Sequence, residues 1–560
     1  MKILLLGINA RYTHVNLALY YLGLYIDPAK HETVLIERTI NDSIDDVIAE
    51  IAINDPDVLC LSVYIWNNRY IQSILKDIKK INEDLIIVCG GPDISWNSNK
   101  WIEDFPSIDY IISGVGERGF EILCQNDFVY PQKIVDTDNY HFSQIKMPYS
   151  EKDLANFAHR YVYYEASRGC VCNCSYCISS IDKTKVEPIS DRHIQKVEYK
   201  SFEKIKEDLL FILSSEPIII KFIDRSFNAN NSLCLEIWNF LSILNTSTKF
   251  HFEVHPLFIN EEQIEVLKSI PKGRFQLEVG IQTIHDNTLN LIDRKGSWEI
   301  IRGSLKKLSS LVNIHLHYDM LVGLPGESLH DVFDSFSEII KFLPDHFQIG
   351  FLKVLPGTKI HTEVEKYGYN YQEEAPYKIL SSNTLSYSDI LIMSNLELVI
   401  DLLYNANIMK TLMLEIIQNI PNFKDFFLEL KDCFIANNVH KNTTNRQILF
   451  KIVMDNITTS NIIPQKSFFI DCLRYDWFVS QETHFYPEFI SSERTDLFKE
   501  RNYKSFKEDW QKTQKGEYKL KLKNAIFFSP EDEYFREKYL NRAEGAVKVN
   551  NEFYYIKKRD

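Results

Sequence analysis

The sequence predicts an α/β protein with two successive strand–helix regions and a mostly helical C-terminal region. Short apolar runs alternate with segments of helical periodicity over residues 1–128 and again over residues 161–374. Over residues 375–560, apolar side chains recur mainly at helical spacing. Strands that alternate with helices form βαβ units, whose strands are parallel. We therefore expect two parallel sheets, joined by a linker over residues 129–160, and a third domain.

In the first region, predicted strands alternate with predicted helices. The strands are expected at 3–7, 32–37, 58–63, 85–89 and 110–112, and the helices at 16–26, 43–53 and 69–81. Ligands of parallel sheets bind beyond the carboxyl ends of the strands. Glycine-rich loops follow two of these ends, Gly90-Gly-Pro-Asp93 and Gly114-Val-Gly-Glu117. They indicate either a close approach to a ligand or tight turns, and the first loop lacks the G-x-G-x-x-G pattern of dinucleotide-binding folds.

The central region predicts six strands with intervening helices. The strands are expected at 160–165, 218–223, 250–254, 274–279, 314–321 and 346–354, and the helices at 202–213, 233–244, 261–270, 300–311 and 329–342. Helical periodicity resumes over 389–420 and 422–437. The chain is then rich in aromatic residues, namely Tyr475, Trp477, Phe478, Phe485, Tyr486 and Phe489. We expect these aromatic side chains to pack in a core, with a substrate-facing wall as the alternative.

Composition excludes several classes of protein. The 560 residues include 77 acidic and 63 basic side chains, a net charge of −14, so a nucleic-acid substrate is not expected. No apolar run reaches the length of a membrane span, and the N-terminus does not resemble a signal peptide. Four of the ten cysteines lie between residues 170 and 177, which indicates metal chemistry in a reducing compartment. We expect a soluble cytoplasmic protein without membrane contact.

The cysteine motif is the most specific feature of the chain. Cys170, Cys174 and Cys177 have the spacing C-x3-C-x2-C, and Tyr176 precedes the last of them. Three thiolates can hold three irons of a [4Fe–4S] cluster and leave the fourth iron open, whereas such clusters normally have four cysteine ligands. A zinc site would need a fourth Cys or His nearby, and none follows; a chance group of core cysteines is the other alternative. Cys172 lies off the spacing, so we do not expect it to be a ligand.

This motif and its flanking Ser167-Arg-Gly resemble the radical S-adenosylmethionine (SAM) enzymes, in which SAM binds the open iron. The resemblance implies a partial (β/α)6 barrel and contacts to SAM at the strand ends. Asp224 would take the place of the family's common Gly-Gly-Glu and pair with the SAM ammonium, and Glu253 would accept from the ribose. Asp319-Met-Leu-Val-Gly-Leu-Pro-Gly-Glu327 also resembles a family segment. The SAM-binding residues implied are Tyr176, Asp224, Glu253, Glu278, Gln282 and Val354.

The first region resembles the Rossmann-like cobalamin-binding domain of class B radical SAM enzymes. Ser62 and the Gly90-Gly91 pair match positions that contact the nucleotide tail and the corrin in that family. The D-x-H-x-x-G motif is absent, so His14 is either a cobalt ligand or a hydrogen-bonding, structural histidine. Tyr12 and Trp66 would cover the lower corrin face or simply pack. The cobalamin-binding residues implied are Arg11, Tyr12, His14, Ser62, Tyr64, Trp66, Gly90, Gly91, Pro92, Gly114, Gly116 and Glu117.

The resemblance implies three cofactors, a [4Fe–4S] cluster, SAM and cobalamin, and favours a methyltransferase that acts on an unactivated carbon. The substrate would be a small molecule or a peptide, and an external flavodoxin or ferredoxin would supply electrons. No catalytic side chain is identified. Alternatives are oxidation, rearrangement or cyclisation without methyl transfer, and a cofactor-sensing binding protein. A methylthiotransferase-like enzyme is less favoured, because its second cluster needs three N-terminal cysteines and Cys60, Cys89 and Cys124 are scattered.

Overall fold

The computed structural model divides the chain into two compact units. The first contains residues 1–335 and 350–387, and the second contains 336–349 and 388–560. The residues that the structure describes are 1–137, 142, 145–157, 160–180, 197–480, 487–513, 526–541, 543–549 and 552–556. Phe485 and Tyr486 lie outside the described residues.

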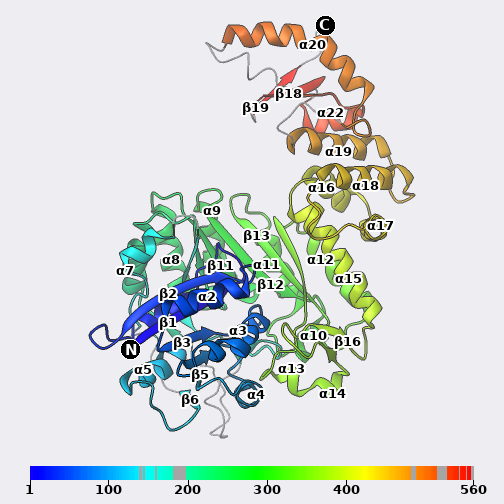
Figure 1. The fold of residues 1–560 in the computed structure, drawn as a ribbon. Coiled ribbons are helices and arrows are strands. Elements are labelled where there is room, and N and C mark those ends of the chain that lie inside the picture. Colours follow the sequence, from blue (N-terminus) through cyan, green and yellow to red (C-terminus); the bar gives the residue numbers. More distant parts are fainter. Residues whose placement is uncertain are drawn as a thin grey trace. The chain divides into compact units, whose positions relative to one another are not determined.

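A six-stranded sheet forms the first half of the first unit (Figure 1). Its strand order is β2-β1-β3-β4-β5-β6, and every neighbouring pair is parallel. The strands are β1 (Lys2–Asn9), β2 (Glu32–Thr39), β3 (Val58–Ser62), β4 (Ile86–Gly90), β5 (Tyr110–Gly114) and β6 (Ile134–Thr137). The last strand was not predicted: β6 lies in the segment 129–160 that was expected to be a linker, and that segment also contains α6 (Glu151–Ala155).

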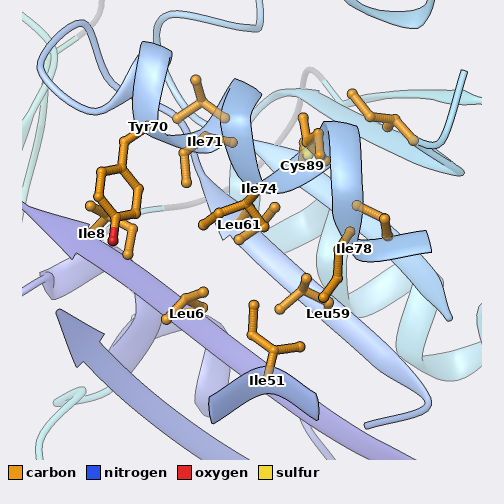
Figure 2. Packing of buried hydrophobic residues seen from close by; sticks show 14 of the residues in the cluster. Leu6, Ile8, Ile51, Leu59, Leu61, Tyr70, Ile71, Ile74, Ile78 and Cys89 are labelled. Carbon is orange, nitrogen blue, oxygen red and sulfur yellow. The ribbon is translucent and has the colours of Figure 1, made fainter. Parts of the chain in front are cut away.

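Helices cover both faces of this sheet, and alternate side chains of each strand point to opposite faces. Leu59 and Leu61 of β3 pack under α2 (Ile44–Asn54) and α3 (Asn68–Ile81), as Figure 2 shows. Val58 and Cys60 point to the other face, which is covered by α1 (Leu17–Gly23) and α5 (Gly116–Gln125). Two helices that the sequence did not predict complete this half, α5 and α4 (Ser98–Asp104).

A second six-stranded sheet, of order β14-β13-β12-β11-β10-β7, forms the barrel part. Its strands are β7 (Tyr161–Tyr164), β10 (Ile219–Phe222), β11 (Lys249–Val254), β12 (Phe275–Gln282), β13 (His315–Val322) and β14 (His346–Phe351). The pairs from β7 to β13 are parallel. The intervening helices are α7 (Phe202–Leu213), α8 (Asn231–Ile243), α9 (Glu261–Ser269), α10 (Asp286–Leu291), α11 (Trp298–Leu308) and α12 (Leu329–Ile340). The predicted α/β fold with two parallel sheets is confirmed.

The second unit is mostly helical, as predicted. Its helices are α15 (Tyr387–Val399), a π-helical turn (Ile400–Asn405), α16 (Lys410–Asn419), α17 (Phe423–Ala436), α18 (Arg446–Thr459), α19 (Lys466–Ser480), α20 (Glu493–Thr513) and α22 (Glu533–Tyr539). A small antiparallel sheet of β17 (Ile526–Phe528), β18 (Gly545–Val549) and β19 (Glu552–Ile556) was not predicted. Tyr475 and Phe478 of α19 pack against Phe528 and Phe535, so these aromatic residues contribute to a core. Within the described residues, no helix has the length and apolar character needed to cross a membrane.

Candidate active site and cofactor cavities

The cysteine loop follows the short strand β8 (Ser167–Arg168) and is fixed by backbone hydrogen bonds. The Cys177 N–H donates to the Cys174 carbonyl over 3.0 Å. The Ser175 N–H donates to the carbonyl of Ile292, and the Ile360 N–H donates to the carbonyl of Ser175, each over 2.9 Å. Loops that lie far apart in the sequence therefore hold the middle of the cysteine motif in place.

A cavity of about 170 Å³ adjoins this loop at the carboxyl ends of β10 to β13. It is lined by Cys170, Cys172, Cys174, Tyr176, Cys177, Arg225, Ser226, Glu253, Val254, His255, Glu278, Gly280, Gln282, Arg294 and Asp319. We call it the cluster cavity. In the described part of the chain, no three His, Cys, Asp or Glu side chains converge on one metal-ion position. Convergence is not required for a [4Fe–4S] cluster, because each thiolate binds a different iron, so the cysteine-lined cavity suits such a cluster.

The thiols of the loop differ in their acidity. The Cys172 side chain donates to Cys170 and thereby lowers the pKa of the Cys170 thiol, and the Cys172 N–H donates to the same sulfur over 3.4 Å. Burial raises the pKa of Cys174, although the Arg294 guanidinium, with Nη1 3.6 Å from the Cys174 sulfur, opposes this. The arrangement makes Cys172 a hydrogen-bond donor to Cys170, and its exclusion from the ligand set stays a prediction.

The structure brings four of the predicted SAM-binding residues to the cluster cavity and places two elsewhere. The four that line it are Tyr176, Glu253, Glu278 and Gln282. Asp224 is buried beside the cavity lining, where it accepts hydrogen bonds from the Ala166 N–H over 3.1 Å and from the Ser167 hydroxyl. Burial raises the pKa of Asp224 to about 7. Val354 is fully buried away from the lining, and its N–H donates to the Tyr377 carbonyl.

The carboxylates of the cluster cavity are held in different ionisation states. Burial raises the pKa of Glu253 to about 7, although Arg225 lies 3.9 Å away. Burial has the same effect on Glu278, but the hydrogen bond from His251, 3.0 Å long, and the nearby His317 outweigh it and lower the pKa of Glu278. At neutral pH the cavity therefore contains one firmly ionised glutamate and one that is readily protonated.

A larger cavity of about 500 Å³ lies at the carboxyl ends of β3, β4 and β5, on the side covered by α1 and α5. We call it the deep cavity. The predicted cobalamin-binding residues that line it are Ser62, Tyr64, Gly90, Gly91, Pro92, Gly114, Gly116 and Glu117. Gly91 has φ +115°, and a Cβ there would lie 2.5 Å from the Val63 carbonyl oxygen. Apolar side chains such as Val88 and Phe120 also line it.

A third cavity of about 560 Å³, the middle cavity, shares lining residues with each of the other two. It shares Tyr64 and Glu117 with the deep cavity and Arg225 and Glu253 with the cluster cavity. Trp66 also lines it and stacks on Tyr64, with ring centroids 4.3 Å apart and planes 8° apart. The three cavities are therefore neighbours, arranged in the order deep, middle and cluster cavity, with shared residues in their walls.

His14, Arg11 and Tyr12 have different positions in this series. His14 lines the middle cavity, and its Nδ1 is hydrogen-bonded to the Tyr163 hydroxyl. This contact gives the ring a structural partner, and burial lowers the pKa of His14. Arg11 and Tyr12 are exposed and lie outside the lining of all three cavities.

Several residues of the site were missed by sequence reasoning. Arg168 donates to Glu117 over 2.9 Å and to Glu165 over 2.7 Å, so it joins the N-terminus of α5 to the start of the cysteine loop. His255 lines the cluster cavity from the position directly after β11, and Arg294 lines it from the loop after α10. Arg168 stands two residues before the first cysteine and His255 directly follows the predicted strand 250–254, so their positions gave a local signal, whereas nothing in the local sequence distinguishes Arg294.

Comparison with protein families assigns three consecutive parts of the chain. Residues 3–124 match the B12 binding domain, residues 164–339 match the radical SAM superfamily, and residues 365–552 match a protein family of unknown function, DUF4080. The first two assignments imply cobalamin, SAM and a [4Fe–4S] cluster as cofactors.

Individual relatives are distant. A ribosomal protein uS12 methylthiotransferase, RimO from Leptospira biflexa, is 23% identical over 51% of this chain and 61% of its own length. The cobalamin-dependent radical SAM methyltransferase TokK from Streptomyces tokunonensis is 20% identical over 60% of this chain and 52% of its own length. The chain thus spans about half to three-fifths of these curated relatives.

Solved structures share the fold. The cobalamin-dependent SAM radical enzyme OxsB, with aqua-cobalamin and SAM bound, has a TM-score of 0.56 and 15% identity, covering 92% of this chain and 82% of OxsB. The radical SAM methyltransferase TsrM from Kitasatospora setae, with cobalamin and a [4Fe–4S] cluster bound, has a TM-score of 0.53 and 13% identity, covering 65% of this chain and 74% of TsrM. The chain thus contains a segment that matches the radical SAM superfamily, preceded by one that matches the B12 binding domain and followed by one that matches the DUF4080 family, and it shares the fold of these two solved structures.

Proposed function

We propose that this enzyme is a cobalamin-dependent methyltransferase that acts on an unactivated carbon. The observation that carries the proposal is the neighbouring position of the deep, middle and cluster cavities, which share lining residues. It provides room for cobalamin on one side of the substrate and for SAM with the cluster on the other. When bound, these cofactors supply a radical that removes a hydrogen atom from the substrate and a methyl group that replaces it.

The residues of the chain bind and orient these groups. Ser62 and the small Gly90-Gly91 pair leave space for the nucleotide tail of cobalamin in the deep cavity, and the Tyr64–Trp66 stack provides an apolar wall for the corrin. Cys170, Cys174 and Cys177 hold the cluster, and Glu278 and Gln282 face SAM from β12. A small molecule or peptide enters the middle cavity, and a flavodoxin or ferredoxin supplies the electron.

Two other activities remain as candidates. RimO methylthiotransferases are among the relatives, but a second cluster in the first domain would require its cysteines to meet. Cys60 and Cys124 pack in the core under α1 and α5, whereas Cys89 packs in the core on the opposite face of the sheet. Their separation disfavours methylthiolation. A reaction without methyl transfer is the second candidate, because OxsB, which shares the fold, is named as a cobalamin-dependent SAM radical enzyme and not as a methyltransferase.

The experiment that tests the proposal does not require the substrate. Anaerobically reconstituted protein is loaded with hydroxocobalamin, reduced, and given SAM that carries a deuterated methyl group. We expect the label on the bound cobalamin together with S-adenosylhomocysteine, and 5′-deoxyadenosine in the same sample. Cys170→Ala should abolish deoxyadenosine formation, and Cys172→Ala should retain it. Formation of deoxyadenosine without labelled cobalamin or S-adenosylhomocysteine would contradict methyl transfer and support the alternative chemistry.

A further inference from the structure

We propose that His255 donates a hydrogen bond from its Nε2–H to an anionic acceptor in the cluster cavity. The acceptor is either a sulfur atom, of the cluster itself or of a cysteine thiolate that binds it, or the carboxylate of SAM. His255 follows β11 and precedes a short 3₁₀ turn (Pro256–Phe258). The inference rests on the cluster and SAM of the radical SAM domain and is independent of methyl transfer.

The hydrogen bonds of His255 determine its tautomer. The backbone N–H of Leu257 donates to Nδ1 over 3.2 Å. A backbone N–H can only donate, so Nδ1 is unprotonated, and a neutral imidazole then carries its proton on Nε2. Burial, with a smaller effect from the Arg294 charge, lowers the pKa of His255 to about 3, which keeps the ring neutral. Nε2 is therefore an N–H donor.

This donor has no acceptor among the residues that the structure describes. His255 is only 4% exposed, so bulk solvent does not supply the partner, and the residue lines the cluster cavity together with the cysteines. Buried donors in native proteins nearly always have partners, because an unpaired one is costly. A ligand of the cavity is therefore the group that would accept from Nε2.

The position of His255 is fixed by its neighbours. Its N–H donates to Asn228 Oδ1 over 2.9 Å, and Asn228 Nδ2 donates back to the His255 carbonyl over 3.1 Å. The Ser304 hydroxyl donates to the carbonyl of Pro256 over 2.8 Å. Such a support is typical of a residue whose side chain must meet a ligand at a defined place, and it exceeds what a three-residue turn needs.

A second buried donor indicates that the acceptor is anionic. Arg294 lines the same cavity, and its Nε has no acceptor within the described chain either. Its Nη1 lies 3.6 Å from the sulfur of Cys174, one of the three proposed cluster ligands, so one N–H of this cation already faces a sulfur that would be anionic when the cluster is bound. The ring of Phe258, 5.3 Å from that of His255, packs against the cysteine loop. Hydrogen bonds to cluster sulfurs raise the reduction potential, and those to a carboxylate strengthen binding.

Two substitutions separate the donor role from the capping role. His255→Asn retains an acceptor for the Leu257 N–H, since Asn is a favoured cap residue, but it is too short to place a donor at Nε2. His255→Gln places an amide N–H near the position of Nε2 but loses the cap. Each variant is reconstituted with its cluster, and two quantities are measured. These are the cluster midpoint potential without SAM, by EPR-monitored titration, and the dissociation constant of SAM, by calorimetry.

We expect His255→Asn to change one quantity and His255→Gln to restore it at least in part. A more negative potential without SAM identifies a sulfur acceptor, and a several-fold weaker SAM affinity at unchanged potential identifies the carboxylate. If His255→Asn matched the wild type in both measurements, or if the two variants changed them equally, the proposal would be overturned in favour of a capping role. Methyl transfer does not enter either measurement. A negative result here would therefore leave the proposed methyl transfer untouched, and a negative result for methyl transfer would leave this inference untouched.

Discussion

Small residues in the loops of the first sheet leave the space of the deep cavity. Gly91 and Gly114 both have positive φ, and a Cβ at either would lie 2.5 Å from a carbonyl oxygen, of Val63 and Thr137 respectively. Gly116, at the start of α5, also lines the cavity but has no atom within 4 Å of an added Cβ. Neighbouring glycines of the same cavity therefore differ in how much they tolerate a side chain.

We predict that Gly91→Ala lowers both stability and cobalamin uptake. The clash and the unfavourable φ should cost on the order of 1–3 kcal/mol, and any backbone shift would move Ser62 and Pro92 in the cavity wall. Cobalamin bound per protein is measured by absorbance after reconstitution, and stability by denaturation. Gly116→Ala is the matched control, with near-normal uptake. Normal cobalamin uptake by the Gly91→Ala variant would show that cobalamin binding does not depend on the conformation of this turn.

Asp224 gives a prediction about pH. Its folded-state pKa of about 7 lies above the ordinary 3.8 because of burial. A raised carboxyl pKa means that the folded state binds the proton more tightly, so stability should fall as pH rises from about 4 to about 7, by up to about 1.4 kcal/mol per unit of pKa difference. Asp224→Asn mimics the protonated form and should flatten this fall.

Denaturation midpoints of the wild type and Asp224→Asn, measured at several pH values, check this prediction. Equal pH slopes for the two proteins would contradict it. SAM affinity measured on the same variant tests the role first expected for Asp224. A loss of roughly 1.5–3 kcal/mol in binding would support a contact with the SAM ammonium.

At the scale of elements, α3 shows how an amphipathic helix closes one face of the first sheet. Ile71, Ile74 and Ile78 are almost fully buried against the strands, as Figure 2 shows, whereas Ile81 at the end of the helix is 56% exposed. This face is densely packed, and the deep cavity lies on the opposite side of the sheet. The α3 face therefore stabilises the sheet, and the α1–α5 face accommodates a ligand.

We predict that Ile74→Ala destabilises the first unit by about 2–5 kcal/mol, because it removes buried methyl groups and leaves a cavity. Ile81→Ala, the same substitution at an exposed position of the same helix, should stay within about 0.5 kcal/mol of the wild type. Denaturant unfolding followed by the fluorescence of the first unit measures both. Equal effects of the two substitutions would mean that α3 does not pack as described.

At the scale of the whole molecule, ion pairs join the two sheets of the first unit. Arg160, just before β7, is 2.5 Å from Glu37 of β2, and the two side chains are 11% and 8% exposed. The same guanidinium also donates to the carbonyls of Tyr12 and His14. A second pair, Arg69 with Glu374, is 2.9 Å long but more than 60% exposed on both sides. The first pair is the buried connection between the B12-binding domain and the barrel.

We predict that Arg160→Met destabilises the first unit by about 3–5 kcal/mol, because it leaves Glu37 buried without its cation. Arg69→Met should cost no more than about 1 kcal/mol, since the exposed pair is weak. Adding Glu37→Gln to Arg160→Met should recover part of the loss. A double-mutant cycle of unfolding free energies gives the coupling, and a coupling near zero would rule out this ion pair as the connection.

The sequence by itself determined the two parallel sheets, most of their strands and helices, the cysteine motif and the families of the first two domains. These follow from local patterns: alternating apolar residues in strands, helical periodicity, glycine-rich loops and the spacing of Cys170, Cys174 and Cys177. Four of the six residues expected to contact SAM line the cluster cavity: Glu253, Glu278 and Gln282 because the ends of parallel strands meet at one edge of a sheet, and Tyr176 because it belongs to the cysteine loop. The domain boundaries and the roles of the site residues stay predictions.

Only the tertiary structure decided the rest. β6 lies in a segment with little periodicity and is a strand because β5 offers it an edge. Asp224 follows a strand of the barrel as expected, but the N–H of Ala166 and the hydroxyl of Ser167 reach its carboxylate. His255 and Arg294 come to the cysteine-lined cavity from separate loops, and the middle cavity is lined by residues of both sheets. Each of these depends on contacts between residues distant in sequence, which a local pattern does not encode.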